Sequence, residues 1–124
     1  MFIEKDLKIR RMRAGDIDAV DELEQKIFRN PWSKKEMLRI LDEDNLEFSV
    51  VAEFINEIIG YAFSWVVIDE VHIGNIAVKE GFRRLKIGTR LMDYIINETL
   101  NMGGKLFFLE VRKSNESAIN LYKK

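Results

Sequence analysis

Apolar and polar positions follow two different periods in the first third of this chain. Residues 7–13 (LKIRRMR) alternate weakly and predict a first strand. Residues 14–28 predict a helix, because apolar side chains recur there at helical spacing and acidic residues lie near the start, where the helix dipole favours them. A second helix is predicted to start at Ser33, which forms a capping box with Glu36 just after Pro31.

The middle of the chain predicts three successive strands. Residues 47–54, 58–69 and 70–78 are rich in β-branched and aromatic side chains, which favour strands. The polar residues 55–57 separate the first two segments and indicate a hairpin turn. The Gly74–Asn75 pair interrupts the third segment, and an internal glycine of this kind predicts a β-bulge.

The last third predicts a helix, a strand and the start of another helix. The first helix runs from about Lys86 to Met102 and ends at the Gly103–Gly104 pair, as a C-cap does. Residues 105–112 read as a near-continuous buried strand, and residues 114–124 begin the last helix. The side chains expected to face inward from the first helix are Leu91, Met92, Ile95, Ile96 and Leu100.

The order of elements predicts one α/β domain with a mixed sheet over residues 1–124. This order is β-α-α-β-β-β-α-β-α, and its strand–helix–strand passage implies a parallel pair of strands. A length of 124 residues suits one domain, and 47% hydrophobic with 33% charged residues is an ordinary globular mixture. There are no internal repeats or linkers.

Charge and residue usage exclude several classes of protein. A net charge of −1 argues against general nucleic-acid affinity, which needs a basic excess. With no cysteine and a single histidine, neither a thiolate metal site nor the usual histidine-based zinc cluster is predicted. No apolar run approaches the roughly 20 residues of a membrane span, and the N-terminus does not resemble a signal peptide. These features predict a soluble cytoplasmic protein.

The stretch FRRLKIGTRLM, residues 82–92, is basic and opens the predicted helix that follows the third central strand. Backbone N–H groups at a helix N-terminus lack partners and attract anions. Arg83 and Arg84 add positive charge, and Gly88 allows a ligand to approach the backbone closely. A solvated basic turn explains the same residues equally well. The spacing is neither that of a Walker loop nor that of the dinucleotide-binding fingerprint.

The run NIAV followed by RRLKIGTRLM resembles the signature of the GNAT acetyltransferases, in which Q/R-x-x-G-x-G/A holds the pyrophosphate of acetyl-CoA. Arg83 matches its first position and Gly88 its last, whereas Lys86 replaces the middle glycine. If residue 86 needs a positive φ, lysine costs about 1 kcal/mol there, and acetyl-CoA affinity is weakened or altered at most. The contacts that the resemblance implies for acetyl-CoA are Ile76, Ala77, Val78, Arg83, Arg84, Lys86, Ile87, Gly88, Thr89 and Asn115.

Two further segments, LEVRKSNESAINLY (109–122) and NPWS (30–33), resemble N-terminal acetyltransferases, most of all the subfamily that acetylates the N-terminal alanine of a ribosomal protein. The resemblance covers nearly the whole chain. It implies acetyl transfer from acetyl-CoA to a protein N-terminal α-amine, that of a ribosomal protein, with Glu110 as general base and Tyr122 as general acid.

The residues by themselves leave these roles open. Glu110 is an acid in an otherwise apolar strand, where it serves either function or an ion pair with a neighbouring arginine. Tyr122 in a terminal helix equally suits packing. Trp32 is a candidate for the acceptor site, although it also occupies a staple position of the second helix. Glu70 is a candidate acceptor-side acid, and His72 on the same strand is interpreted as structural.

Members of this family continue past the LY motif with two more strands, whereas this chain ends at Lys124. The expectation is therefore a C-terminally short GNAT fold with an open sheet edge, as a monomer or as a dimer that pairs through this edge. A fragment of a longer chain, strand exchange within a dimer and a natural truncation all explain this pattern. Two other functions stay open. One is a GNAT acetyltransferase for a small amine or a lysine side chain, and the other is a non-catalytic CoA-binding or partner-binding module.

Overall fold

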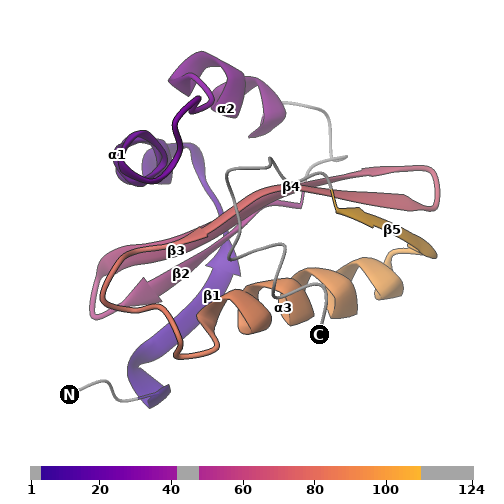
Figure 1. Cartoon of the computed structure of the whole chain (residues 1–124). Coiled ribbons are helices and arrows are strands. Elements are labelled where there is room, and N and C mark those ends of the chain that lie inside the picture. Colours follow the sequence, from indigo (N-terminus) through magenta and orange to yellow (C-terminus); the bar gives the residue numbers. More distant parts are fainter. Residues whose placement is uncertain (1–3, 42–47, 110–124) are drawn as a thin grey trace.

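The computed structural model describes residues 4–41 and 48–109 of the chain (Figure 1). The predicted last helix and the residues after 109 of the predicted final strand lie outside this part. The elements are η1 (Glu4–Asp6), β1 (Leu7–Arg11), η2 (Ala14–Asp16), α1 (Ile17–Ile27), α2 (Lys34–Leu41), β2 (Val50–Phe54), β3 (Glu57–Val67), β4 (Glu70–Val78), α3 (Ile87–Asn101) and β5 (Leu106–Leu109).

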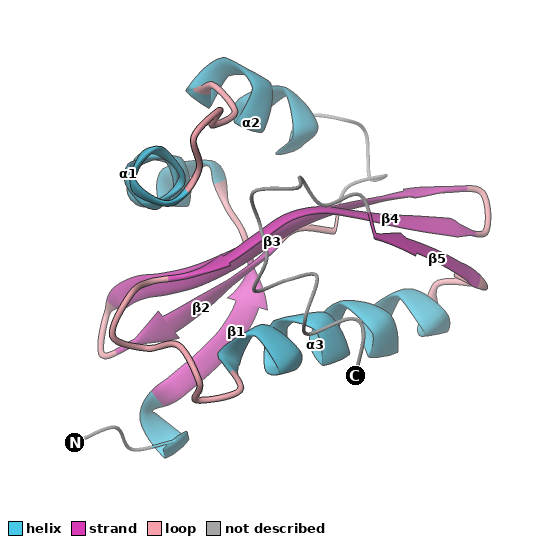
Figure 2. Ribbon diagram, viewed as in Figure 1, coloured by secondary structure: helices cyan, strands magenta, loops and turns pink. Residues whose placement is uncertain are grey.

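The described strands form a single mixed sheet in the order β1-β2-β3-β4-β5. Neighbouring strands are antiparallel except for β4 and β5, which are parallel and flank the crossover helix α3. Helix α3 covers one face of the sheet, and α1 and α2 cover the other (Figure 2). The predicted α/β class and the predicted parallel pair are therefore confirmed.

The predicted β-bulge lies in β4. Ala62 pairs with Ile76 and Ser64 pairs with Ile73, so a single β3 residue, Phe63, faces the Gly74–Asn75 pair of β4. Gly74 has no room for a side chain, because a Cβ atom added there would lie 2.9 Å from the Trp32 ring and 3.1 Å from the Trp65 ring. The missing side chain thus lets two indole rings pack over the bulge, and the prediction from the Gly–Asn pair is confirmed.

The start of α1 is fixed to β1 by an ion pair. The guanidinium of Arg10 donates hydrogen bonds of 2.9 Å to both carboxylate oxygens of Asp16, and the Arg13 N–H donates a third bond of 2.8 Å. Burial by itself raises the pKa of Asp16, but these hydrogen bonds outweigh it and hold the pKa below its usual value. Asp16 is therefore a carboxylate at neutral pH, and it orients the helix that carries part of the site.

Two predictions about burial were wrong. Leu100 is 50% exposed, and Thr99 takes the inward position instead. At 100° per residue Leu100 lies about 180° around the helix from Leu91, so the two cannot share one face. The final strand is not continuously buried over its described part, since Leu106 is 51% and Phe108 is 42% exposed. The alternate residues Phe107 and Leu109 pack against the core on the α3 side, so the described part of β5 alternates between buried and exposed side chains.

Candidate functional site

The loop that joins β4 to α3 (residues 79–86) has an unusual backbone. Gly81 has φ 96°, Arg84 has φ 68° and Lys86 has φ 62° with ψ 23°. All three lie in the left-handed region, which costs residues other than glycine about 1–2 kcal/mol each. Lys86, which replaces the middle glycine of the motif, therefore adopts a positive φ.

The N-terminus of α3 is open to an anion. Lys86 is the N-cap residue, and its side chain makes no capping hydrogen bond. The first N–H groups of a helix have no acceptor within the helix, and its dipole places partial positive charge at this end. Arg83 anchors the loop, because its Nε donates a hydrogen bond of 3.1 Å to the carbonyl oxygen of Val78. A helix N-terminus of this kind suits an anionic group.

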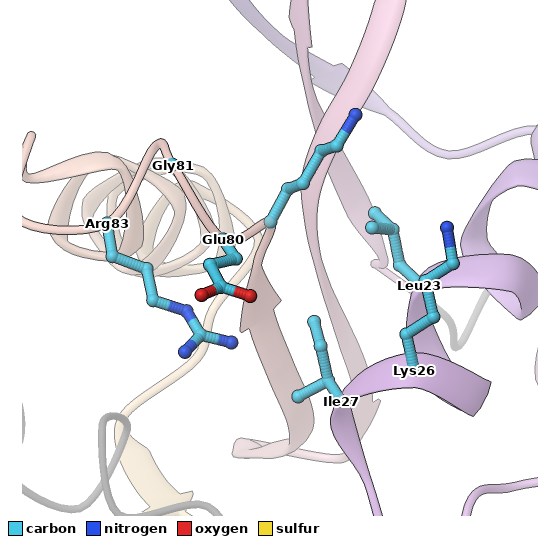
Figure 3. Close-up of a pocket in the computed structure, with 7 residues that line it drawn as sticks. Leu23, Lys26, Ile27, Glu80, Gly81 and Arg83 are labelled. Carbon is cyan, nitrogen blue, oxygen red and sulfur yellow. The ribbon is translucent and has the colours of Figure 1, made fainter.

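A hollow of about 430 Å³ lies between α1 and this loop (Figure 3). Glu80 and Arg83 lie on one side of it, and Leu23 and Ile27 of α1 lie on the other. The lining is both apolar and charged, which suits a ligand with a flexible chain and phosphate groups. Its residues are Leu23, Lys26, Ile27, Lys79, Glu80, Gly81 and Arg83.

The left-handed Lys86 yields a test of the loop geometry. Lys86→Gly is expected to be about 1 kcal/mol more stable than Lys86→Ala, because only glycine adopts this φ without steric cost. Thermal unfolding followed by circular dichroism measures the difference. Alanine is the matched control, since both variants lose the same ammonium group and differ only in the Cβ atom. Equal stability of the two variants would contradict the strained backbone.

The strand residues predicted to contact acetyl-CoA lie next to this loop. Ile76 and Ala77 are buried, and they and Val78 pair with Ala62, Tyr61 and Gly60 of β3. On the other side, β4 pairs with β5 only from Glu70 to Ile73 within the described residues. For the rest of that edge of β4, from Gly74 to Val78, the described residues provide no pairing strand.

The candidate acceptor-side residues lie on the α1 and α2 face of the sheet. Trp32 packs beside Gly74 and against Phe63, with ring centroids 5.3 Å apart, and it belongs to the same cluster as the buried Met37. Both interpretations of Trp32 are thus compatible with its place: it packs under α2, and it borders the bulge. Its backbone N–H donates to Glu24.

Glu70 and His72 form a pair at the far end of β4 from the α3 loop. His72 Nε2 lies 3.1 Å from Glu70 Oε1. The imidazole is stacked between Trp65 and Phe108, with ring centroids 5.9 Å and 5.1 Å away. Such a stack suits the structural role predicted for His72, while the Glu70 side chain stays 43% exposed at the rim of the aromatic row.

One buried acid was missed by the sequence analysis. Glu24 of α1 is fully buried and accepts hydrogen bonds from the Tyr61 hydroxyl, the Asn75 amide and the Trp32 N–H. A signal was available, because Glu24 follows Val20 by four residues and lies on the inward stripe of the helix. An acid on that stripe requires partners.

Three predicted residues, Glu110, Asn115 and Tyr122, lie outside the described residues. Glu110 follows Leu109, the last residue of β5, and Leu109 pairs with Ile73, which directly precedes the bulge. Within residues 4–41 and 48–109, no group of three acidic or histidine side chains is placed to hold a metal ion. No helix in this part of the chain is long and apolar enough to cross a membrane.

Comparisons with known proteins agree with the predicted family. The family model described as Acetyltransferase (GNAT) family matches residues 17–124. The chain is 35% identical over 107 residues to the ribosomal protein bS18-alanine N-acetyltransferase of Salmonella typhimurium, covering 86% of this chain and 71% of that protein. It is 32% identical over 114 residues to the protein of the same name from Escherichia coli, covering 92% and 76%.

A solved structure extends this likeness to the fold. The crystal structure of the ribosomal-protein-S18-alanine N-acetyltransferase from Escherichia coli superimposes with a TM-score of 0.83 at 29% identity, over 94% of this chain and 74% of that one. The predicted GNAT fold and the predicted donor, acetyl-CoA, are thus confirmed. The chain belongs to the GNAT acetyltransferase family and is an acetyl-CoA-dependent N-acetyltransferase.

Proposed function

We propose that this enzyme transfers an acetyl group to the N-terminal α-amine of a protein, and that its acceptor is a ribosomal protein that begins with alanine. The observation that supports the proposal is sequence identity of 32–35% to two relatives, each of which is named ribosomal protein bS18-alanine N-acetyltransferase. The likeness to the Escherichia coli enzyme covers 92% of the chain, and the family model matches residues 17–124, which include Glu110 and Tyr122. A ribosomal acceptor also agrees with the predicted cytoplasmic location.

The donor site is proposed to use the N-terminus of α3. The backbone N–H groups of Ile87, Gly88 and Thr89 bind the pyrophosphate, and Arg83 and Arg84 add positive charge. Further contacts are assigned to the backbone of Ile76, Ala77 and Val78, to Lys86 and to the Asn115 side chain. Acetyl-CoA, once bound there, supplies the acetyl group as a thioester.

The proposed roles of two residues follow from the proton balance of the reaction. A protein α-amine has a pKa near 8, so about a tenth of it is neutral at pH 7, against far less for lysine at about 10.4. Glu110 accepts the amine proton through a water molecule. The new C–N bond forms as the C–S bond breaks, and Tyr122 donates a proton to the departing sulfur. The products are an acetylated N-terminus and free CoA.

The acceptor side is assigned to Trp32 and Glu70. Trp32 borders the bulge of β4 and presents an aromatic surface to a peptide. The half-exposed Glu70 carboxylate lies beside the stacked rings of Trp65, His72 and Phe108. Its negative charge attracts the ammonium group of an acceptor. Trp32 lies on the face of the sheet opposite α3, in the cluster that α1 and α2 cover.

The proposal is tested by the release of thiol from acetyl-CoA with peptides that begin with alanine, serine or methionine. The alanine peptide is expected to have the highest kcat/KM. A matched peptide with a blocked N-terminus and one internal lysine is expected to show no turnover. If the blocked peptide or small amines are acetylated faster than the alanine peptide, the acceptor is a lysine side chain or a small amine and not a protein α-amine. Binding of acetyl-CoA without thiol release would instead support the non-catalytic module.

A further inference from the structure

A single buried carboxylate is hydrogen-bonded both to the turn that carries Trp32 and to the bulge of β4. Glu24 lies in α1, and its hydrogen-bond donors come from three other segments of the chain. The Tyr61 hydroxyl of β3 donates over 2.5 Å to Oε1. The Asn75 amide of the β4 bulge donates over 2.7 Å to Oε2, and the Trp32 backbone N–H donates over 2.8 Å to the same oxygen.

The two donors on Oε2 are the ones that border the candidate acceptor site. Asn75 is half of the bulge pair, and Trp32 is the residue whose ring packs over the other half, Gly74. Since one oxygen atom receives both bonds, it sets the separation between the Trp32 turn and the bulge. Among the described residues, the Asn75 Oδ1 atom has no hydrogen-bond partner, and the bond from its amide nitrogen to Glu24 orients this buried side chain.

A carboxylate holds this arrangement more strongly than a neutral group would. Both of its oxygens accept hydrogen bonds, and a charged acceptor strengthens each one. Glutamine has nearly the same shape, but one of its ends is a donor. In the folded protein that end would face either the Tyr61 hydroxyl or the Asn75 and Trp32 donors. The Tyr61 hydroxyl can accept a hydrogen bond from that end, so the amide oxygen would still face the Asn75 and Trp32 donors. It is a neutral acceptor, however, and holds these two buried donors more weakly than a carboxylate oxygen does.

We propose that Glu24 is a positioning residue of the acceptor site, one that holds the Trp32 turn against the β4 bulge. It acts through Trp32 and Asn75 and not on the reacting atoms, because it is fully buried. The inference rests on the proposed function in so far as the acceptor binds beside Trp32. It deepens that function by naming what holds the surface against which the N-terminal peptide packs.

The test compares Glu24→Gln with Tyr61→Phe, which removes one donor from the same carboxylate but leaves the Trp32 and Asn75 bonds. The chain has two tryptophans, so a nitrogen–proton correlation spectrum shows two indole signals, and Trp65→Phe assigns them. Glu24→Gln is expected to move the Trp32 indole signal and to raise KM for the alanine peptide about tenfold. Tyr61→Phe is expected to leave both near their wild-type values, and calorimetry is expected to show unchanged acetyl-CoA affinity in both variants.

Several outcomes would overturn the inference. Equal changes of the Trp32 signal and of KM in the two variants would show that Glu24 only stabilises the fold, as would no change in a folded Glu24→Gln. If Glu24→Gln does not fold, Asn75→Ala breaks only the link to the bulge, and the same Trp32 shift and KM increase are expected from it. The indole signal is read without turnover, so it tests Glu24 even if no peptide is acetylated, which would defeat the proposed function alone.

Discussion

Replacing Glu110 by glutamine is expected to lower kcat/KM for an alanine peptide by about 10²- to 10⁴-fold at pH 7, the usual contribution of a general base. Glutamine keeps the shape of the side chain but does not take up a proton near neutral pH. The acceptor amine then has to lose its proton to bulk water, and most of it is charged at this pH. Thiol release under initial-rate conditions measures the loss.

The pH dependence separates this role from a structural one. Above about pH 8 the acceptor is mostly a free amine, so the defect of Glu110→Gln is expected to narrow. A variant that only damages the fold would lose the same factor at every pH. Glu98→Gln on α3 is the matched control and is expected to keep wild-type kinetics. Wild-type kcat/KM in Glu110→Gln, with acetyl-CoA still bound, would remove Glu110 from the chemistry.

Leu91→Ala is expected to lower the free energy of unfolding by about 3 kcal/mol, within the range measured for buried leucines. Leu91 of α3 has no exposed surface and lies in the core between this helix and the sheet. The truncation removes buried methyl groups and leaves a cavity that the sheet cannot close. Urea unfolding followed by circular dichroism measures the change. Because α3 carries the proposed pyrophosphate site at its N-terminus, acetyl-CoA is expected to recover part of the lost stability.

Leu100→Ala on the same helix is the matched control. Its side chain is half exposed, so the same truncation is expected to cost less than about 0.5 kcal/mol. The pair compares one chemical change at two positions about half a helical circumference apart. Equal losses at the two positions would contradict the observed orientation of α3.

The local features of this fold were accessible from the sequence because each depends on residues close together in the chain. Ser33 and Glu36 were predicted as a capping box, and the Glu36 N–H does donate to Ser33 Oγ over 3.1 Å while Glu36 Oε1 accepts from the Ser33 N–H. The Gly74–Asn75 bulge and the hairpin turn at Ile55 and Asn56 follow equally from local backbone preferences. The GNAT family itself was recognisable from short motifs.

Other features depend on residues far apart, and only the tertiary structure decided them. The partners of Glu24 lie 8, 37 and 51 residues away, so no local pattern shows that this acid joins a turn, a strand and a bulge. Whether Lys86 takes a left-handed backbone depends on how β4 and α3 are placed, because the loop between them has to close that gap. Helical periodicity indicated that α3 has an inward face, but packing against the sheet determined that Thr99 faces inward and Leu100 faces solvent.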